Sequence, residues 1–365
     1  MKMTVKRRES RRINIGGVII GGGAPIAVQS MTNTDTHDIE ATYRQIRRLE
    51  AAGCDVVRLA VPDIDAAGTF AALKARGISL PLVADIHFDY RIALAALENG
   101  ADKIRINPGN IGSREKTEAV VRACRERGVP IRIGVNSGSV QKELLAKYGA
   151  PTPEALAESA LLHARILEEL DFHDIAISVK SSSVITTIEA NRILAERTSY
   201  PLHLGVTEAG ARLRAQVKSS IGIGTLLAEG IGDTVRVSLT DDPVEEISAA
   251  NEILSALGLS KAQGMDIVAC PTCGRTKINL IDLLREFEER ATAEGLMGLD
   301  IKVAVMGCAV NGPGEAREAD IGIAGGNGEG LIFRCGEILR KVPESALLDE
   351  LIKEIKMIRD EKNAL

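Results

Sequence analysis

Short apolar segments rich in β-branched residues alternate with amphipathic helical patterns along the first 258 residues. We expect eight of these segments to be strands: 25–31, 55–61, 81–87, 102–108, 130–136, 174–180, 201–207 and 233–239. Glycines stand where four of the helical patterns end, as is usual at helix C-termini: Gly53, Gly77, Gly100 and Gly128. Eight strands alternating with helices predict an α/β fold of the TIM (β/α)8 barrel type.

A doubly wound parallel sheet is the alternative arrangement for this pattern. Its usual GxGxxG turn after the first strand is missing, because the glycines at 21–23 precede a strand instead of opening a helix. We interpret these glycines as a turn, and the segment 12–22 as a hairpin that closes the floor of the barrel.

The pattern changes near residues 258–264, and a second domain of about 100 residues follows. It combines an amphipathic helix over 278–293, two glycine-rich strands within 319–326 and 329–336, and a charged helix at the end of the chain. We therefore expect a barrel domain over 1–258 and a small α+β domain over 259–365.

Composition excludes several classes of function. Aromatic residues make up 2% of the 365 residues and tryptophan is absent, so the chain lacks the stacking platforms of single-strand nucleic-acid binders. A net charge of −5 argues against broad binding to phosphate backbones. Because no segment is apolar enough for a membrane span or a secretory signal, we expect a cytoplasmic protein whose six cysteines are reduced thiols or metal ligands.

Cationic residues mark five different predicted strands near their carboxyl ends. They are Arg58, Arg105, Arg132, Lys180 and Arg236. A single arginine in a strand is commonly paired with a neighbouring carboxylate. Five cations that meet at one mouth of a barrel instead indicate a polyanionic ligand, because guanidinium groups match phosphate oxygens. We infer a diphosphate or polyphosphate substrate.

Other polar residues lie at the same strand ends. They are Asp85, His87, Asn107, Asn136, His203, Thr207 and Glu208. Asp85 and His87 are two positions apart, so they point to the same side of a strand and are candidates for acid–base chemistry, with an ordinary polar strand end as the alternative. The segment 218–230 is a candidate helix start near a phosphate, with a plain glycine turn as the alternative.

The second domain carries a group of cysteines. Cys270 and Cys273 form a CxxC pair after a predicted strand, a spacing compatible with a redox disulfide, a zinc site or an iron–sulfur cluster. Cys308 follows in a glycine-rich loop, and we expect the Asn-Gly-Pro-Gly turn after it to bring Glu315 back toward the thiolate. Three thiolates and one carboxylate would leave an iron–sulfur cluster with one weakly held corner. A structural zinc site with Cys335 as fourth ligand is the alternative.

The chain resembles the family of bacterial 4-hydroxy-3-methylbut-2-enyl diphosphate synthases, the iron–sulfur reductases of the non-mevalonate isoprenoid pathway. The resemblance rests on RLAVP, VADIHFDYR, KIRINPGN, IRIGVNSGS, ISVKSS, GVTEAG, CPTCGRT and MGCAVNGPGEA, and it covers essentially the whole chain. It implies a TIM barrel followed by an iron–sulfur domain of the sulfite-reductase type. It also implies two-electron ring opening of 2-C-methyl-D-erythritol 2,4-cyclodiphosphate, with loss of water.

The resemblance assigns roles to residues of this chain. The ligands of a 4Fe–4S cluster would be Cys270, Cys273, Cys308 and Glu315. The diphosphate would be bound by Arg58, Arg105, Asn107, Arg132, Asn136 and Lys180. The sugar-derived carbons would be lined by Asp85, His87, Thr207 and Glu208. Glu208 would be a candidate proton donor, and Glu315 would be catalytic as well, because a substrate oxygen would displace it from the cluster.

The same resemblance implies partners. Flavodoxin or ferredoxin would donate the electrons, and the cluster domain of one subunit of a homodimer would close the barrel of its partner.

Two other classes of function fit parts of the pattern. A barrel-type phosphate-ester enzyme related to pteroate synthases would carry a structural zinc domain, whereas an iron–sulfur electron carrier would leave the cationic strand ends without a purpose.

Overall fold

The computed structural model describes residues 5–261, 264–308 and 316–363. Its internal contacts divide the chain into two compact units, Met1–Lys261 and Ala262–Leu365. No helix within the described ranges is long and apolar enough to cross a membrane.

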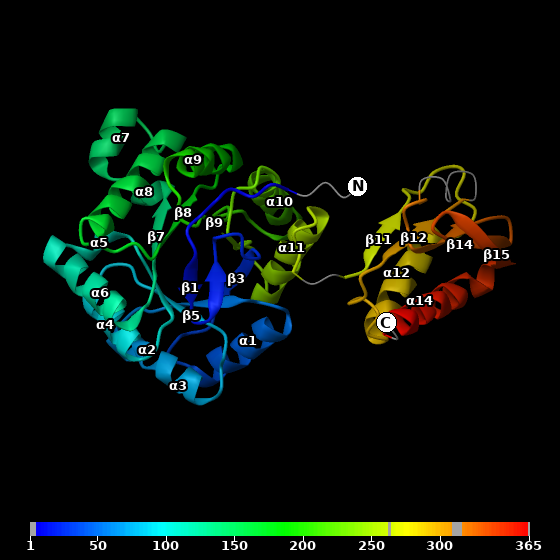
Figure 1. The fold of residues 1–365 in the computed structure, drawn as a ribbon, viewed down its shortest axis with the longest axis horizontal. Helices are drawn as coiled ribbons and strands as arrows, with labels where there is room; N and C mark the ends of the chain where they lie inside the picture. The colour runs from blue at the N-terminus through cyan, green and yellow to red at the C-terminus, as the bar shows by residue number, and fades with distance from the viewer. Residues whose placement is uncertain (1–4, 262–263, 309–315, 364–365) are drawn as a thin grey trace. The chain divides into compact units, whose positions relative to one another are not determined.

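The first unit is a barrel of eight parallel strands surrounded by helices (Figure 1). The strands are β3 (Ala27–Met31), β4 (Val56–Ala60), β5 (Leu82–Asp85), β6 (Lys103–Ile106), β7 (Ile131–Asn136), β8 (Ile175–Lys180), β9 (His203–Leu204) and β10 (Thr234–Val235). They run in the order β8-β7-β6-β5-β4-β3-β10-β9, and a parallel bridge between Ile177 and Leu202 completes the ring. Every strand lies within a predicted segment, so the predicted TIM barrel is confirmed.

Helices follow the strands and cover the outside of the barrel. They are α1 (Ile39–Ala51), α2 (Ile64–Ala67), α3 (Thr69–Ala75), α4 (Tyr90–Glu98), α5 (Pro108–Ile111), α6 (Arg114–Arg127), α7 (Lys142–Tyr148), α8 (Pro153–Glu168), α9 (Val184–Arg197), α10 (Arg212–Ala228) and α11 (Pro243–Ala256). The four glycines expected at helix ends all have φ between 64° and 88°, the left-handed region that glycine tolerates. Helix α10 begins at Arg212, so the expected helix start near residue 218 is wrong.

The segment before the barrel forms the expected hairpin. Strands β1 (Ile13–Ile15) and β2 (Val18–Ile20) pair in antiparallel fashion. Ile13, Ile15 and Ile20 pack against Ala27 and Ala176, which lie at the amino ends of β3 and β8. The hairpin therefore closes the floor of the barrel, at the end opposite to the strands' carboxyl ends.

The interior of the barrel is unusually polar. On β6, for example, Ile104 and Ile106 join the core between the strands and the helices, whereas Lys103 and Arg105 alternate with them and point inward. Branched apolar side chains usually fill this space in TIM barrels. Charged residues in their place indicate that the interior serves binding at least as much as packing.

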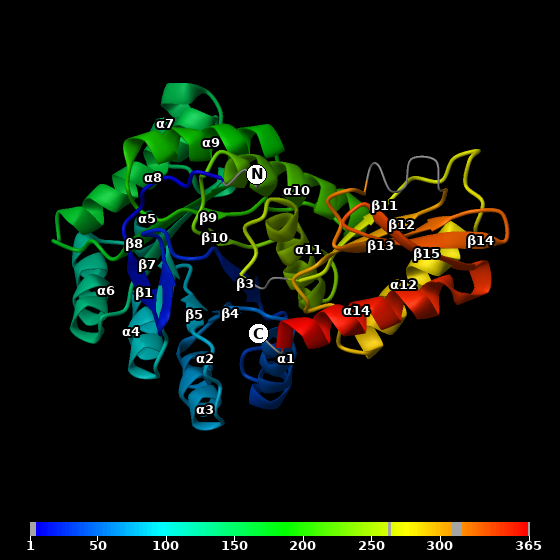
Figure 2. The ribbon, with the colours of Figure 1, turned by 45° about the vertical axis from the view of Figure 1, so that its right-hand side comes forward.

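The second unit has a sheet and a core of its own. Its strands are β11 (Asp266–Ala269), β12 (Lys302–Met306), β13 (Ile321–Gly325), β14 (Glu329–Arg334) and β15 (Glu337–Pro343), in that order. The first three are parallel, and β14 and β15 continue the sheet in antiparallel fashion. Helices α12 (Leu280–Ala293) and α14 (Leu347–Asn363) pack together on one face (Figure 2). An α+β unit was expected here, although β12 and β15 were not named among its strands.

Candidate functional site

A polar cavity of about 170 Å³ lies where the barrel strands end at their carboxyl termini. It is lined by Arg58, Asp85, His87, Arg105, Arg132, Asn136, Ser178, Lys180, Thr207, Arg236 and Ser238. Eight of these residues were named from the sequence as substrate-binding or catalytic, and the fold brings them together at one site.

The strands position these side chains by their alternation and their register. Directly paired positions on neighbouring strands include Asp85 with Arg105, Arg105 with Arg132, and Asn136 with Lys180. Because alternate residues of a strand face the same side, a charge at one inward position lies beside the charge on the next strand. The ring of charges follows from the barrel geometry.

Asp85 is the anionic centre of the cavity. Its carboxylate is 3.1 Å from Nη1 of Arg105, 3.7 Å from Nε of Arg58 and 3.7 Å from Nε2 of His87. Burial alone would raise the pKa of Asp85, but the neighbouring positive charges, those of Arg58 and Arg105 first, lower it instead. Asp85 therefore stays ionised and holds two of the guanidinium groups in place.

Arg132 has more donors than the protein satisfies. It is 1% exposed, and its Nη1 donates to Oγ of Ser178 at 2.6 Å. Its Nε and Nη2 have no hydrogen-bond partner among the described residues, and neither does Nε of Arg105. Burial and the charges of Arg58 and Arg105 lower the pKa of Arg132 well below its ordinary value. Unpartnered buried donors of this kind indicate a ligand that accepts hydrogen bonds.

Lys180 brings a second kind of cation to the site. It is 7% exposed, and its Nζ lies 3.3 Å from Nε2 of the buried His203. Burial, followed by the charge of Arg132, lowers the pKa of Lys180 well below its ordinary value. Five of the residues lining the described cavity are cationic against one carboxylate, so the site is built for an anion.

Two residues named from the sequence lie apart from the cavity lining. The side chain of Asn107 is buried and accepts a hydrogen bond from the backbone N–H of Gly109, where it caps α5. Glu208 is exposed in the loop after β9 and has a φ of 51°, a left-handed conformation that is unusual for this residue type. Asn107 therefore shapes the loop after β6, and the Glu208 carboxylate faces solvent.

Three lining residues received no role from the resemblance, although Arg236 was already named among the five cations at the strand ends. Ser178, Arg236 and Ser238 share the inward alternation of their segments, with Ser178 two positions before Lys180 and Ser238 two positions after Arg236. This spacing is the signal that identifies them. Arg236 is held by Glu246 of α11, which accepts from its Nη2 at 2.9 Å and its Nε at 3.2 Å.

In the second unit, cysteines follow two adjacent parallel strands. Cys270 comes directly after β11, and Cys308 comes two residues after β12. The backbone N–H of Gly307 donates to Sγ of Cys270 at 3.1 Å. Hydrogen bonds from the backbone and then the side chain of Arg275 lower the pKa of Cys273, which favours its thiolate.

These thiols have the donor chemistry of an iron–sulfur or zinc site. N–H groups that donate to sulfur, as at Cys270, are among the features that tune iron–sulfur clusters. Within the described ranges, however, no three His, Cys, Asp or Glu side chains come close enough to form a metal site. Glu315 lies outside the described residues.

Cys335 lies at the other end of this sheet. It follows β14, which runs antiparallel to β13, and its backbone N–H donates to the carbonyl of Ala319, just before β13 begins. Cys308 instead follows the carboxyl end of β12, which is parallel to β13. A zinc site that combines Cys335 with the other three cysteines is therefore wrong on topological grounds.

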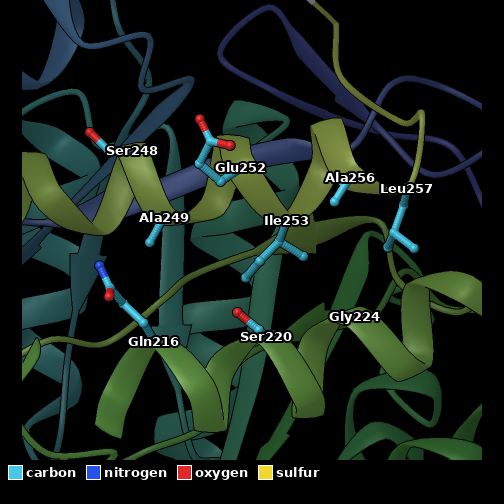
Figure 3. Close-up of a pocket in the computed structure, with 9 residues that line it drawn as sticks. All are labelled: Gln216, Ser220, Gly224, Ser248, Ala249, Glu252, Ile253, Ala256 and Leu257. Atoms are coloured by element: carbon cyan, nitrogen blue, oxygen red, sulfur yellow. The ribbon is translucent and has the colours of Figure 1, made fainter. Parts of the chain in front are cut away.

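A larger hollow of about 670 Å³ lies on the outside of the barrel between α10 and α11 (Figure 3). Small side chains such as Ser220, Ser248 and Ala249 line it, and Glu252 is its one ionisable lining residue in the described chain. Its lining lacks the acid–base and cationic groups of the smaller cavity. We therefore place the candidate active site at the mouth of the barrel.

Comparison with known proteins adds the family to this geometry. Residues 10–251 match the family model of the GcpE TIM-barrel domain, and residues 266–357 match that of the GcpE protein C-terminal domain. The chain belongs to the GcpE family. The two matched regions lie in the two units described above, with the cation-lined cavity in the first and the three cysteines in the second.

Several relatives from the GcpE family are similar over nearly their whole length. A protein from Clostridium perfringens is 63% identical over 97% of this chain and 100% of its own length. One from Geobacter sulfurreducens is 58% identical, over 98% of this chain and 100% of its own length. Both are named 4-hydroxy-3-methylbut-2-en-1-yl diphosphate synthase (flavodoxin).

Solved structures with a similar barrel are much more distant in sequence. N-acetylneuraminic acid synthetase from Leptospira borgpetersenii has a TM-score of 0.50 at 13% identity, with 79% of this chain and 99% of that chain covered. Type I 3-dehydroquinate dehydratase from Clostridium difficile has a TM-score of 0.50 at 14% identity, with 68% and 98% covered. These likenesses show the barrel fold alone.

Proposed function

We propose that this chain is a 4-hydroxy-3-methylbut-2-en-1-yl diphosphate synthase. It would take up two electrons and two protons to convert 2-C-methyl-D-erythritol 2,4-cyclodiphosphate into the linear allylic diphosphate and water. The observation that carries the proposal is the pair of buried guanidinium groups, Arg105 and Arg132, with donors that no described residue accepts. A diphosphate supplies those acceptors, and the names of the GcpE relatives point to this particular diphosphate.

The barrel cations would bind and orient the cyclic diphosphate. They are Arg58, Arg105, Arg132 and Lys180, with Asn136 at the rim. When the ring carbon–oxygen bond breaks, the freed phosphate oxygen gains negative charge. Donors that are already fixed in a buried site stabilise this charge more strongly than they stabilise the substrate, and that difference accelerates the reaction.

The loss of a hydroxyl group as water requires a proton. His87 is exposed enough to exchange protons with solvent, and it lies 3.7 Å from the carboxylate of Asp85. Glu208 is the second candidate donor. Its left-handed backbone costs free energy, and such conformations cluster at functional sites. Thr207, between Val206 and Glu208, lines the cavity and would contact the sugar-derived carbons.

A 4Fe–4S cluster would be held by Cys270, Cys273, Cys308 and Glu315 in the second unit. The thiol chemistry described above fits such a cluster. When bound, the cluster supplies single electrons to the substrate. The backbone N–H of Gly307 would stabilise the negative charge on the sulfur of Cys270. The backbone and the side chain of Arg275 would do the same for the sulfur of Cys273.

Flavodoxin, or ferredoxin in its place, would supply the electrons in the cytoplasm, where the thiols stay reduced. The chain would act as a homodimer in which the cluster domain of one subunit completes the barrel site of its partner. An exposed apolar stripe on α10 supports a contact between copies: Leu213, Val217 and Ile221 are 72%, 48% and 50% exposed. They recur every four residues along α10, the helix that also forms one wall of the hollow in Figure 3, and a second copy of this chain would cover them.

Anaerobic turnover tests the proposal. Protein with its cluster reconstituted is mixed with reduced flavodoxin and the cyclodiphosphate, and phosphorus NMR follows the conversion of the cyclic into the linear diphosphate. Failure to form the product with an intact cluster would contradict the proposed function.

Metal analysis separates the proposal from its alternatives. We expect about four iron and four acid-labile sulfide per chain. One zinc without sulfide would instead support a phosphate-ester enzyme with a structural zinc domain. A full cluster in a protein that binds no diphosphate would support an electron carrier.

A further inference from the structure

Lys180 belongs to a chain of three buried polar side chains that continues below the cavity. Its Nζ is 3.3 Å from Nε2 of His203, and Nδ1 of His203 is 2.7 Å from Oγ1 of Thr234. His203 is 0% exposed and Thr234 is 2% exposed, and neither lines the cavity. This series of hydrogen bonds therefore connects Lys180, which lines the cavity, with His203 and Thr234, which do not.

The amine of Lys180 is confined as well as hydrogen-bonded. Gly205 lies two residues after His203, and a Cβ atom placed on it would be 2.7 Å from Nζ of Lys180 and 3.1 Å from Cε. The amine thus packs directly against the backbone of Gly205. Among the described residues, His203 is the side chain with which Nζ of Lys180 forms a hydrogen bond.

No carboxylate compensates the charge of this amine. The charged groups that face Lys180 or His203 from the other strands are Arg58, Lys103, Arg105, Arg132 and Arg236. Asp85, the carboxylate of the cavity, pairs with Arg58 and Arg105. Glu246 pairs with Arg236. An ammonium group at position 180 therefore lacks a counter-charge in the described residues until an anion enters.

The hydrogen-bond chain accommodates both protonation states of Lys180. An ammonium group only donates, so it requires His203 to accept at Nε2 and to donate from Nδ1 to Oγ1 of Thr234. A neutral amine accepts instead from Nε2–H, and the hydroxyl of Thr234 then donates to Nδ1. Two neutral tautomers of one imidazole serve the two states, and neither leaves a ring nitrogen without a partner.

We propose that His203 is a positioning residue that holds the amine of Lys180 at the cavity, and that the amine takes up one proton from solvent when a phosphate group enters. The anion supplies the missing counter-charge, so the newly formed ammonium donates both to a phosphate oxygen and to Nε2 of His203, which then carries its proton on Nδ1. This inference rests on the diphosphate site of the proposed function, and it does not depend on the reaction.

The pH dependence follows from the charges. In the free protein, burial and the neighbouring cations lower the pKa of Lys180. The bound anion raises it again, so a proton is taken up on binding at any pH between the two values. Affinity for the anion then falls as the pH rises through this window, by up to about tenfold per pH unit for one proton.

Calorimetric titration of the full-length protein with pyrophosphate tests the inference. Titrations in two buffers of different ionisation enthalpy at one pH give the number of protons taken up. Because pyrophosphate itself titrates, the quantity that decides is the difference between the wild type and Lys180→Met. We expect pyrophosphate binding to the wild type to take up as much as about one proton more than binding to Lys180→Met. Equal uptake by the two proteins would overturn the proposal.

Variants of the two buried partners separate positioning from general packing. His203→Leu removes the acceptor and should weaken pyrophosphate binding about tenfold or more, whereas His203→Gln keeps an acceptor toward Lys180 and should restore most of the affinity and the proton uptake. Thr234→Val keeps the shape of the side chain but removes the hydroxyl that pairs with Nδ1 of His203 in both tautomers. It should therefore shift the pH profile of pyrophosphate binding. Ser219→Ala, a buried change on α10, is the matched control.

The outcomes distinguish this inference from the proposed function. Equal affinity and proton uptake in His203→Leu and the wild type would overturn the role of His203. Loss of binding in His203→Gln as severe as in His203→Leu would overturn the positioning role, since it would indicate a requirement for the imidazole itself. Normal proton uptake without turnover of the cyclodiphosphate would contradict the proposed function and leave the present inference standing.

Discussion

At the residue scale, the cavity is organised by an imbalance of charge. Five cations and one carboxylate line it, and that carboxylate, Asp85, already pairs with Arg58 and Arg105. Arg132 and the amine of Lys180 are left to face the cavity without a paired carboxylate among the described residues. Removing a cation and removing the carboxylate should therefore have opposite effects on the binding of an anion.

Arg132→Met is the first test of this imbalance. We expect pyrophosphate affinity to fall roughly 10- to 100-fold, because hydrogen bonds to a charged group are worth about 1.5–3 kcal/mol. The unfolding temperature should stay the same or rise, because the substitution removes one buried positive charge from a group of charges that repel one another. Calorimetric binding and thermal unfolding measure the two effects. Ser178→Ala keeps the charge and removes the partner of Nη1, so it should cost only about threefold in affinity.

Asp85→Asn should show the reverse pattern. The cavity gains net positive charge, so pyrophosphate should bind more tightly, while the fold loses the counter-charge of Arg58 and Arg105 and becomes about 3–5 kcal/mol less stable. In the wild type the carboxylate has a lowered pKa, so its contribution to stability is complete above the ordinary aspartate pKa and is lost as the pH falls through the lowered value. Denaturant unfolding at several pH values checks this, and a variant with wild-type acid sensitivity would contradict it.

How far single residues could be predicted depends on how rare their chemistry is at a strand end. An arginine or lysine in an apolar strand is conspicuous, and its inward position follows from the alternation. Serines such as Ser178 are common in strands, so their residue type gives no signal and only their two-residue spacing from a cation identifies them. Asn107 is ambiguous in another way, because an asparagine after a strand is equally suited to cap a helix. Its Oδ1 caps α5, its buried Nδ2 has no partner among the described residues, and its role in diphosphate binding stays a prediction.

At the element scale, two glycines within the strand segments make room for the cations. A Cβ atom on Gly134 of β7 would lie 2.4 Å from Nε of Arg105, and one on Gly205 would lie 2.7 Å from Nζ of Lys180. Real Cβ atoms do not approach other atoms so closely. Each strand segment therefore has a glycine, without a side chain, where a long cationic side chain crosses it. The glycines are part of the binding site although they offer no functional group.

Gly134→Ala should displace the guanidinium group of Arg105 from Asp85. We expect pyrophosphate affinity to fall about tenfold and the free energy of unfolding to fall by about 1–3 kcal/mol, as for other overpacked sites. Gly138→Ala is the matched control, because a Cβ atom there meets no atom within 4 Å and the backbone has no positive φ. Equal effects of the two changes on affinity would show that Gly134 has no special relation to Arg105.

The elements themselves were predictable where burial was complete. The eight barrel strands are almost entirely buried, and their β-branched and aliphatic residues mark them in the sequence even where cations such as Lys103 and Arg105 stand between them. Strand β15 was missed because it lies at the edge of its sheet and five of its seven residues are exposed, so its sequence reads as a polar loop. The start of α10 was misplaced because Arg212, Leu213 and Arg214 have no capping side chain before them.

At the scale of the whole molecule, the chemistry is divided between two units. The core of the first contains residues of all the barrel strands, whereas that of the second is built around Phe287, Leu351 and neighbouring residues of its own helices and sheet. The cavity cations lie in one unit, and the candidate cluster ligands Cys270, Cys273 and Cys308 lie in the other. The sequence indicated this division by its change of pattern near residue 258, but the joining of three thiols into one site depends on loop conformations that no local pattern determines.

Because each unit has its own core, the barrel should fold without the rest of the chain. A protein ending at Lys261 should unfold cooperatively in thermal scans, since the cut crosses neither sheet and removes no lining residue of the cavity. Its affinity for pyrophosphate should stay within about threefold of the full-length value, because the guanidinium groups and their partners are all retained. It should contain no iron and turn over no cyclodiphosphate. Binding that vanished in a folded barrel would show that the anion site needs the second unit, and the assignment of binding to the barrel alone would be wrong.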